Sequence, residues 1–278
     1  MVARLMDALR AWTRARAVWV PALLLCAALL AGCAAAETPA PTLGPVPRIA
    51  VTPWHAPQVL AWAQAYAAAF GPLAFDVEVV QAGIALQGIR DGTYVVAIGS
   101  LPPEEGGFAT PLGEEALGVV LGSGTGVRQV THSQLAALLA GRTTNWSGIG
   151  GSDTPVLPIV PLPGDDVRTF LDEGLMKGSA YASAARLVAS PEQGLALLHE
   201  DAGAVLLLPL SALPTDLQTV PIDGLRPAVN GGVPDNAYPL IAPRVALALE
   251  EPSGAIRDWL VWIQRELASG NQPPATSN

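Results

Sequence analysis

The sequence predicts an α/β protein with a mostly parallel sheet, in which short apolar strands alternate with helices. Half of the 278 residues are hydrophobic, which is ample for a core in one large domain or in two lobes. The stretch 48–99 alternates three strand-like runs with two helical segments, an order typical of parallel α/β sheets. No internal repeat or heptad run indicates a different architecture.

The amino-terminal stretch has the features of a secretory leader and lies outside the expected fold. Arginines precede an apolar core at 17–30, which is too short to cross a bilayer of about 30 Å comfortably. Leu-Ala-Gly-Cys at 30–33 resembles a lipobox, where a peptidase cleaves before a lipid-carrying cysteine. We therefore expect a lipoprotein signal peptide at 1–32, with an ordinary signal peptide or an uncleaved anchor as the alternatives.

Lipidation at Cys33 predicts where the protein works. Cys26 lies in the leader, so the mature chain would have one cysteine, which carries the lipid, and no disulfide. Two or more acyl chains hold a protein stably on a membrane, whereas one chain binds only marginally. Residues 33–47 are rich in Ala, Pro and Thr and are expected to form a semi-extended tether. We expect a protein of the cell envelope, lipid-anchored to the outer face of the cytoplasmic membrane.

The charge balance excludes some partners. Removing the +3 of residues 1–32 from the formal net charge of −9 leaves −12 for the rest of the chain. So acidic a chain argues against general nucleic-acid binding and against basic docking to anionic lipids. An anion site is still compatible with it, because the donors inside a pocket decide what the pocket binds.

The elements of the first hundred residues follow from apolar periodicity. Strands are expected at 48–52, 75–80 and 94–99, and helices at 57–70 and 84–90. Pro57 opens the first helix and Gly71 stops it. Its expected apolar face is Val59, Ala63, Tyr66 and Phe70. Ligand residues are expected at the carboxyl ends of these strands, which meet at one edge of a parallel sheet.

Further along the chain, a short helix follows Thr131. Thr131 is a candidate N-cap with Gln134 as its capping-box partner, and a leucine stripe ends at Gly141. An apolar strand-like run follows at 156–160, and a last amphipathic helix is expected after a cap at Ser253.

The segment after this helix has a distinctive set of residues, namely Gly141, Arg142, Thr144, Asn145, Trp146, Ser147, Ile149, Gly150 and Gly151. This set resembles a signature of the phosphate-binding-protein family, the extracytoplasmic solute receptors of ABC importers. Shorter matches follow in the family's order, among them Pro-Leu-Ser-Ala-Leu at 209–213, Ile-Asp-Gly at 222–224 and Tyr-Pro-Leu at 238–240. The resemblance covers 48–267, most of the mature chain.

The resemblance implies a two-lobe periplasmic-binding-protein type II fold, each lobe a mixed, mostly parallel sheet flanked by helices. Lobe one would be 48–115 with 213–278, and lobe two 116–212, with the ligand between them. It also implies a monomer that binds a small solute, phosphate or another anion, and an ABC permease as partner.

The family places anion donors in the loops after its first three strands, where this chain has lost most hydroxyls. Thr52 and Ser100 remain, and we expect them to be neutral donors to an anion. Trp54 and His55 could line a more apolar pocket. Alternatively, Trp54 fills the core or a loop, and His55 is a solvated loop histidine.

In lobe two, the family's Gly-Ser-Gly-Thr-Arg loop corresponds to 163–170. Aligning the glycines puts Arg168 on the family arginine, as the ion-pairing donor, whereas aligning the phenylalanines puts Asp166 on the threonine. Asp165 and Asp166 replace neutral donors, and a carboxylate about 4 Å from a phosphate costs about 1 kcal/mol even in a water-like dielectric. Either aspartate is also a candidate cap for a helix at 167–175, or the ligand donates hydrogen bonds or carries positive charge.

The sequence contains no motif that indicates catalysis. The three histidines have no metal-like spacing, no Gly-x-Ser-x-Gly elbow is present, and Asp165 and Asp166 are expected to point apart at a helix start. We expect no catalytic residue, metal or cofactor. Two functions remain: a lipid-anchored solute receptor of an ABC importer, and an envelope interaction or sensory protein that keeps the fold without tight solute binding.

Overall fold

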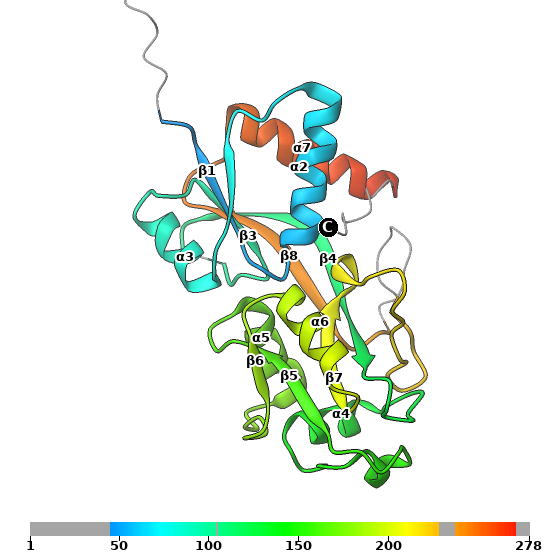
Figure 1. Ribbon diagram of the computed structural model, residues 1–278. Coiled ribbons are helices and arrows are strands. Elements are labelled where there is room, and N and C mark those ends of the chain that lie inside the picture. Colours follow the sequence, from blue (N-terminus) through cyan, green and yellow to red (C-terminus); the bar gives the residue numbers. More distant parts are fainter. Residues whose placement is uncertain (1–44, 104, 228–236, 271–278) are drawn as a thin grey trace, which may run out of the picture. The chain divides into compact units, whose positions relative to one another are not determined.

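A computed structural model describes residues 45–103, 105–227 and 237–270 (Figure 1). The expected signal peptide at 1–32, lipidated Cys33 and most of the tether lie outside the described residues. The tether residues that are described, 45–47, are exposed and belong to no strand or helix. Within the described ranges, no helix is both long and apolar enough to cross a membrane.

The described strands form one mixed sheet. They are β1 (Arg48–Val51), β2 (Asp76–Val79), β3 (Val96–Gly99), β4 (Phe108–Leu121), β5 (Leu157–Pro161), β6 (Arg186–Val188), β7 (Ala204–Pro209) and β8 (Ile241–Ala248). Their order is β2-β1-β3-β8-β4-β7-β5-β6. At one end β1 is parallel to β2 and β3, and at the other β5 is parallel to β6 and β7. The antiparallel strands β8 and β4 join these two parallel groups. The predicted α/β class and the parallel β1–β3 unit are confirmed.

The described helices and strands can be grouped into two structural halves. The α-helices are α2 (Ala56–Phe70), α3 (Ala82–Arg90), α4 (His132–Leu139), α5 (Asp166–Leu171), α6 (Pro191–Glu200) and α7 (Gly254–Ser269). Short helical turns are η2 (Trp146–Ile149), η3 (Asp172–Met176) and η4 (Leu210–Ala212). We call β1–β3 and β8 with α2, α3 and α7 the first half, and β5–β7 with α4–α6 the second half; β4 extends into both. Figure 1 shows α2 beside α7, away from α3.

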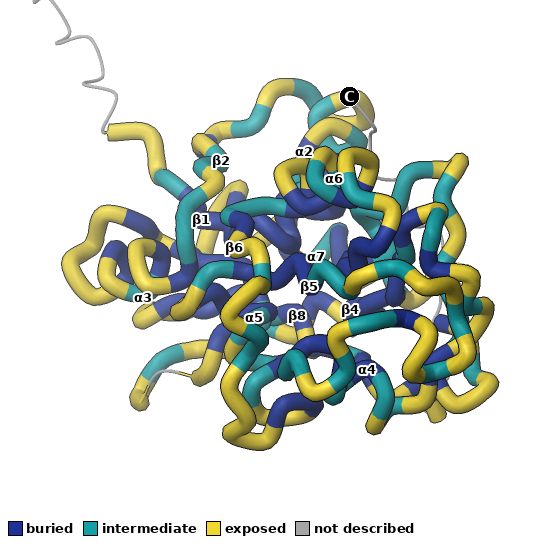
Figure 2. The backbone as a smooth tube through the Cα atoms, turned by 60° about the horizontal axis from the view of Figure 1, so that its bottom comes forward, coloured by how far each residue is buried: buried dark blue, intermediate teal, exposed yellow. Residues whose placement is uncertain are grey.

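Each half has its own apolar core. In the first half, Trp62 of α2 and Trp259 of α7 are fully buried against the sheet, while α3 contributes to a separate cluster with Ala50 and Ala97. Figure 2 shows the strands mostly buried and the loops mostly exposed. The predicted face of α2 is buried at Val59 but not at Phe70, which is 66% exposed at the helix end.

The second-half core is built on the family-like segment. Thr131 and Gln134 form the predicted capping box of α4, and its leucine stripe is fully buried. Trp146 is also buried, and its indole Nε1–H donates to the carbonyl of Gly203 at 2.8 Å. Asn145 caps the turn η2 by accepting from the Ser147 N–H at 2.9 Å. The signature residues therefore hold a loop between α4 and β5 against the sheet.

Some elements differ from the sequence predictions. The strands β4 and β8 were not among the expected strands, and β4 runs from Phe108 to Leu121. The pairing of β4 with β8 shifts register at a bulge between Pro111 and Glu114, so the apolar alternation of a regular strand is missing there. The helix expected at 167–175 ends at Leu171 and continues as the π-helical turn η3, and Ser253 precedes α7 without a side-chain capping bond.

Candidate functional site

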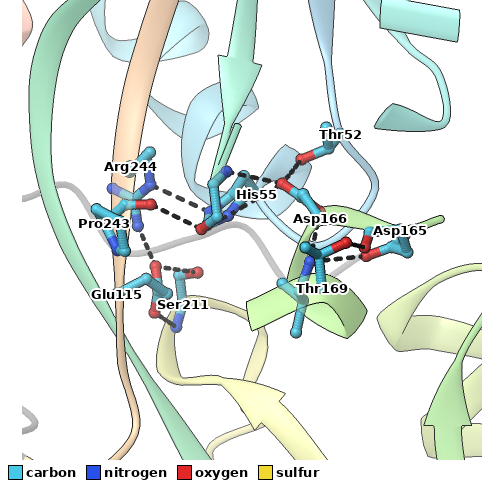
Figure 3. Close-up of polar contacts among 11 residues, drawn as sticks. Thr52, His55, Glu115, Asp165, Asp166, Thr169, Ser211, Pro243 and Arg244 are labelled. Atoms are coloured by element: carbon cyan, nitrogen blue, oxygen red, sulfur yellow. Dashed lines mark hydrogen bonds and ion pairs between the residues drawn. The ribbon is translucent and has the colours of Figure 1, made fainter. Parts of the chain in front are cut away.

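The ends of β1 and β3 meet the start of α5 in a buried polar cluster. Thr52, directly after β1, is fully buried, and its Oγ1–H donates to Oδ2 of Asp166 at 2.7 Å. The backbone N–H of Ser100, directly after β3, donates to the same oxygen at 2.7 Å. Figure 3 shows Thr52 and Asp166 directed at each other, with His55 beside them. The structure therefore brings together three of the predicted ligand-binding residues, one of them from the second half.

Gly99 makes room for this contact. A Cβ on Gly99 would lie 2.5 Å from Oδ2 of Asp166 and 2.7 Å from Oγ1 of Thr52, closer than real Cβ contacts. Any other residue would displace the carboxylate or the hydroxyl. The absence of a side chain at the end of β3 is thus a requirement of the cluster, since the backbone here is approached closely.

His55 lies between this cluster and a buried ion pair. Its Nε2 is 2.9 Å from Oγ of Ser100 and 3.5 Å from Oδ2 of Asp166, and its Nδ1 accepts from Nε of Arg244 at 3.4 Å. Because arginine only donates, Nδ1 must be the acceptor and Nε2 carries the proton. Burial lowers the pKa of His55, which keeps the ring neutral. The expectation of a solvated loop histidine is wrong, because the side chain is fully buried.

Glu115 and Arg244 form the buried ion pair, on the neighbouring strands β4 and β8. The Glu115 carboxylate also accepts from the N–H of Ser211 at 3.1 Å and from its hydroxyl at 2.9 Å. The guanidinium carbon of Arg244 lies 4.8 Å from the ring centroid of Trp62, and burial lowers the pKa of Arg244. A buried charge needs such partners. This pair connects the core of the first half to η4 and to His55.

The two aspartates at the start of α5 have different surroundings. Asp165 is the N-cap, and its Oδ1 accepts from the Val167 N–H at 3.0 Å. Oδ1 of Asp166 accepts from the same N–H at 2.9 Å. Asp165 is therefore the helix cap, as predicted for one of the two, whereas the expectation that their carboxyl groups point apart is wrong. Burial and the adjacent Asp166 raise the pKa of Asp165 to about 8, so Asp165 holds a proton at neutral pH.

Arg168 and Trp54, the remaining predicted ligand residues, lie elsewhere. Nε of Arg168 donates to Asp172 at 2.9 Å and its Nη1 to the carbonyl of Pro161 at 2.9 Å. Its guanidinium also stacks 3.6 Å from the ring centroid of Tyr181. The structure thus does not bring Arg168 to the cluster. Trp54 is fully buried in the second-half core, which agrees with the core-plug interpretation.

An open cavity of about 410 Å³ lies next to the cluster. Its lining comes from both halves and is largely apolar, with Pro53, Pro57 and Leu60 from the first half and Pro191 and Leu195 from the second. Ser211, which donates to Glu115, also lines it. This volume is within the range of small-molecule sites.

The cluster is not arranged for nucleophilic catalysis. A nucleophilic serine must donate its proton to the histidine, but the Ser100 hydroxyl donates to the carbonyl of Pro243 at 2.7 Å. Arg244, rather than a carboxylate, faces the other ring nitrogen of His55. Among the described residues, no group of three or more His, Cys, Asp or Glu side chains could hold a metal ion. The arrangement can bind and orient, using hydroxyl, amide and carboxyl groups.

Comparison with known proteins agrees with this fold. A family model described as the PBP superfamily domain matches residues 35–266. A protein from Clostridium perfringens, named as a phosphate ABC transporter substrate-binding protein and solved with bound phosphate, aligns with a TM-score of 0.72 at 14% identity, over 83% of this chain and 99% of that one. An ABC-type phosphate transport receptor from Vibrio cholerae aligns with a TM-score of 0.62 at 18% identity, over 80% and 95% of the two chains.

A similar fold also occurs in part of a longer chain. A cysteine mutant of OxyR from Corynebacterium glutamicum aligns with a TM-score of 0.56 at 20% identity, over 81% of this chain and 64% of that one. No curated protein matches the sequence. At these identities the structural likeness establishes the fold and leaves the ligand to be argued from the residues.

Proposed function

The chain belongs to the PBP superfamily, and we propose that it is an extracytoplasmic solute-binding protein that binds a small solute between two lobes and delivers it to an ABC permease. In this proposal Cys33 carries the lipid anchor, 33–47 is the tether, and the monomeric receptor works at the outer face of the cytoplasmic membrane. Lobe one comprises 48–115 with 213–278, and lobe two comprises 116–212. The protein catalyses no reaction.

The convergence of strand-end donors on the start of α5 carries the proposal. The Thr52 hydroxyl and the Ser100 amide belong to lobe one, whereas Asp166 belongs to lobe two, and both donors are 2.7 Å from its carboxylate. Groups from both lobes therefore meet at one buried point. A solute that contacts both sides there stabilises the closed arrangement over an open one, as receptor closure requires.

The donors favour a small oxyanion as the solute. A hydroxyl and a backbone N–H both donate, and short donor contacts to a charged oxygen are about twice as strong as neutral ones. The relative from Clostridium perfringens was solved with phosphate, which makes phosphate the first solute to test. Arg168 contributes an ion pair only if it leaves Asp172 and the Pro161 carbonyl, its present partners.

Calorimetric titration tests the proposal. The full chain, solubilised in mild detergent and stripped of bound solute, is titrated with phosphate, sulfate, molybdate, amino acids and polyamines. We expect saturable binding of one solute per chain. If the solute is an oxyanion, Thr52→Val should weaken its binding about 10- to 100-fold in a chain whose Asp166→Ser substitution has removed the competing carboxylate, because a hydrogen bond to a charged group is worth about 1.5–3 kcal/mol. Binding that Thr52→Val leaves unchanged in that chain would place the solute elsewhere.

A second candidate function is an envelope interaction or sensory protein that keeps the fold without tight solute binding. Two observations favour it: the strand-end donors are already satisfied by Asp166, and Trp54 fills the second-half core. A folded wild-type chain that binds none of the solutes would support this candidate over the receptor.

A further inference from the structure

We propose that Asp166 is a tethered anion, whose carboxylate occupies an oxyanion position of the protein's own site and must leave before an external oxyanion can enter. This inference rests on the proposed function for the placement of the site. It deepens that function by naming the residue that controls which solutes bind there.

The position is built for one negatively charged oxygen. Oδ2 of Asp166 accepts from both the Thr52 hydroxyl and the Ser100 N–H at 2.7 Å. Nε2 of His55, the ring nitrogen that carries the proton, lies 3.5 Å from the same oxygen. The side chains of His55 and Asp166 are fully buried, so water does not supply these contacts. Donors around a single oxygen in a dry position make a strong anion site, and the chain fills it with its own carboxylate.

The contact joins segments that are far apart in the chain. Asp166 is 114 residues from Thr52 and 66 residues from Ser100. In the sequence, β4 lies between Ser100 and Asp166. Figure 3 shows the carboxylate reaching from α5 to the loops after β1 and β3. Gly99 leaves the space that the carboxylate needs. The two halves therefore contact each other through the same donors that a solute would use.

An external oxyanion cannot share this position. The Thr52 hydroxyl and the Ser100 amide have one hydrogen each, and both are directed at Asp166. A second anion would also be repelled by the carboxylate. Binding therefore requires that Asp166 withdraw, and the apparent dissociation constant rises by the inverse of the fraction of molecules in which it has withdrawn. Two hydrogen bonds to a charged group correspond to a penalty of about 100-fold or more.

The test is a gain of anion binding. Inorganic phosphate is titrated by calorimetry into the full chain as wild type, Asp166→Ser, Asp166→Asn and Glu173→Gln. Asp166→Ser removes the carboxylate and should bind phosphate about 100-fold more tightly than wild type. Asp166→Asn keeps an oxygen acceptor without the charge and should gain less, about 10-fold. Glu173 is exposed in the neighbouring turn η3, so Glu173→Gln removes one negative charge nearby and should leave phosphate binding unchanged.

The outcomes separate this inference from the proposed function. Equal phosphate affinity in wild type and Asp166→Ser, or an equal gain in Glu173→Gln, would overturn the tethered-anion role. A folded Asp166→Ser chain that still binds no phosphate would overturn it too. If Asp166→Ser does not fold, as judged by circular dichroism, the Asp166→Asn titration decides in its place. Failure of the receptor function is read separately, from wild type against the full set of solutes.

Adding Thr52→Val to Asp166→Ser locates the gained site. The double variant should lose most of the gain, because the hydroxyl donates to the same oxygen position. A gain that survives Thr52→Val would mean that phosphate binds somewhere other than the position vacated by Asp166, and would refute the assignment.

Discussion

Asp165 holds a proton in the folded chain, so the folded chain should become less stable as the pH rises through neutrality. Burial and the adjacent Asp166 raise the pKa of Asp165 to about 8, against 3.8 for an ordinary aspartate. Between these values the folded state holds a proton that the unfolded state has released. The free energy of unfolding therefore falls with rising pH, by about 1.4 kcal/mol per pH unit. Above pH 8 both states have lost the proton and the slope ends.

The window from pH 6.5 to 8 isolates this effect. His55 acts in the opposite direction, because burial lowers its pKa below 6.5. The His55 contribution lowers the free energy of unfolding only as the pH falls below 6.5, where the unfolded state takes up a proton on this histidine. From pH 6.5 to 8 the Asp165 contribution is then about 2 kcal/mol, from 1.4 kcal/mol per unit. Asp165→Asn keeps an N-cap but cannot titrate, so its unfolding free energy should lack this fall.

Urea unfolding measures the difference. Fluorescence of the buried tryptophans Trp54, Trp62, Trp146 and Trp259 reports on both cores. Wild type and Asp165→Asn are compared at pH 6.5, 7, 7.5 and 8, where all other titrating groups are common to both chains. Parallel pH profiles for the two proteins, or a wild-type stability that rises with pH, would refute the protonated Asp165.

Three further substitutions test the frame of the site by the same urea unfolding. Glu115→Gln should destabilise the chain by about 3–5 kcal/mol, because it leaves Arg244 charged and unpaired in the core; a loss below 1 kcal/mol would mean that the pair is solvated. Trp54→Ala should cost about 3–5 kcal/mol by opening a cavity in the second-half core, and a near-neutral effect would show that Trp54 does not fill it. Thr131→Ala should cost about 1 kcal/mol by removing the capping box of α4, and an unchanged free energy of unfolding would refute the role of this cap.

Local signals predicted much of the fold. The capping box at Thr131 and the buried leucines after it lie within one helical turn or two of each other, so short-range rules suffice. The strands β1 and β3 are mostly apolar and buried, and were expected close to their observed bounds. The strands β4 and β8 were missed, because their pairing with each other and the bulge after Pro111 override a weak local pattern.

The sequence placed Thr52, Ser100 and Asp166 among the candidate ligand residues, because its resemblance to the phosphate-binding-protein family assigns anion donors to the expected strand ends and to the loop at 163–170. Only the tertiary structure showed that they contact one another, that His55 is buried, that Glu115 pairs with Arg244, and that Arg168 lies apart. The side-chain contacts among Thr52, His55, Ser100, Glu115, Asp166 and Arg244 join residues 45 to 189 positions apart. A buried polar group is stable only where distant segments supply its partners, and that supply depends on the packing of the whole chain.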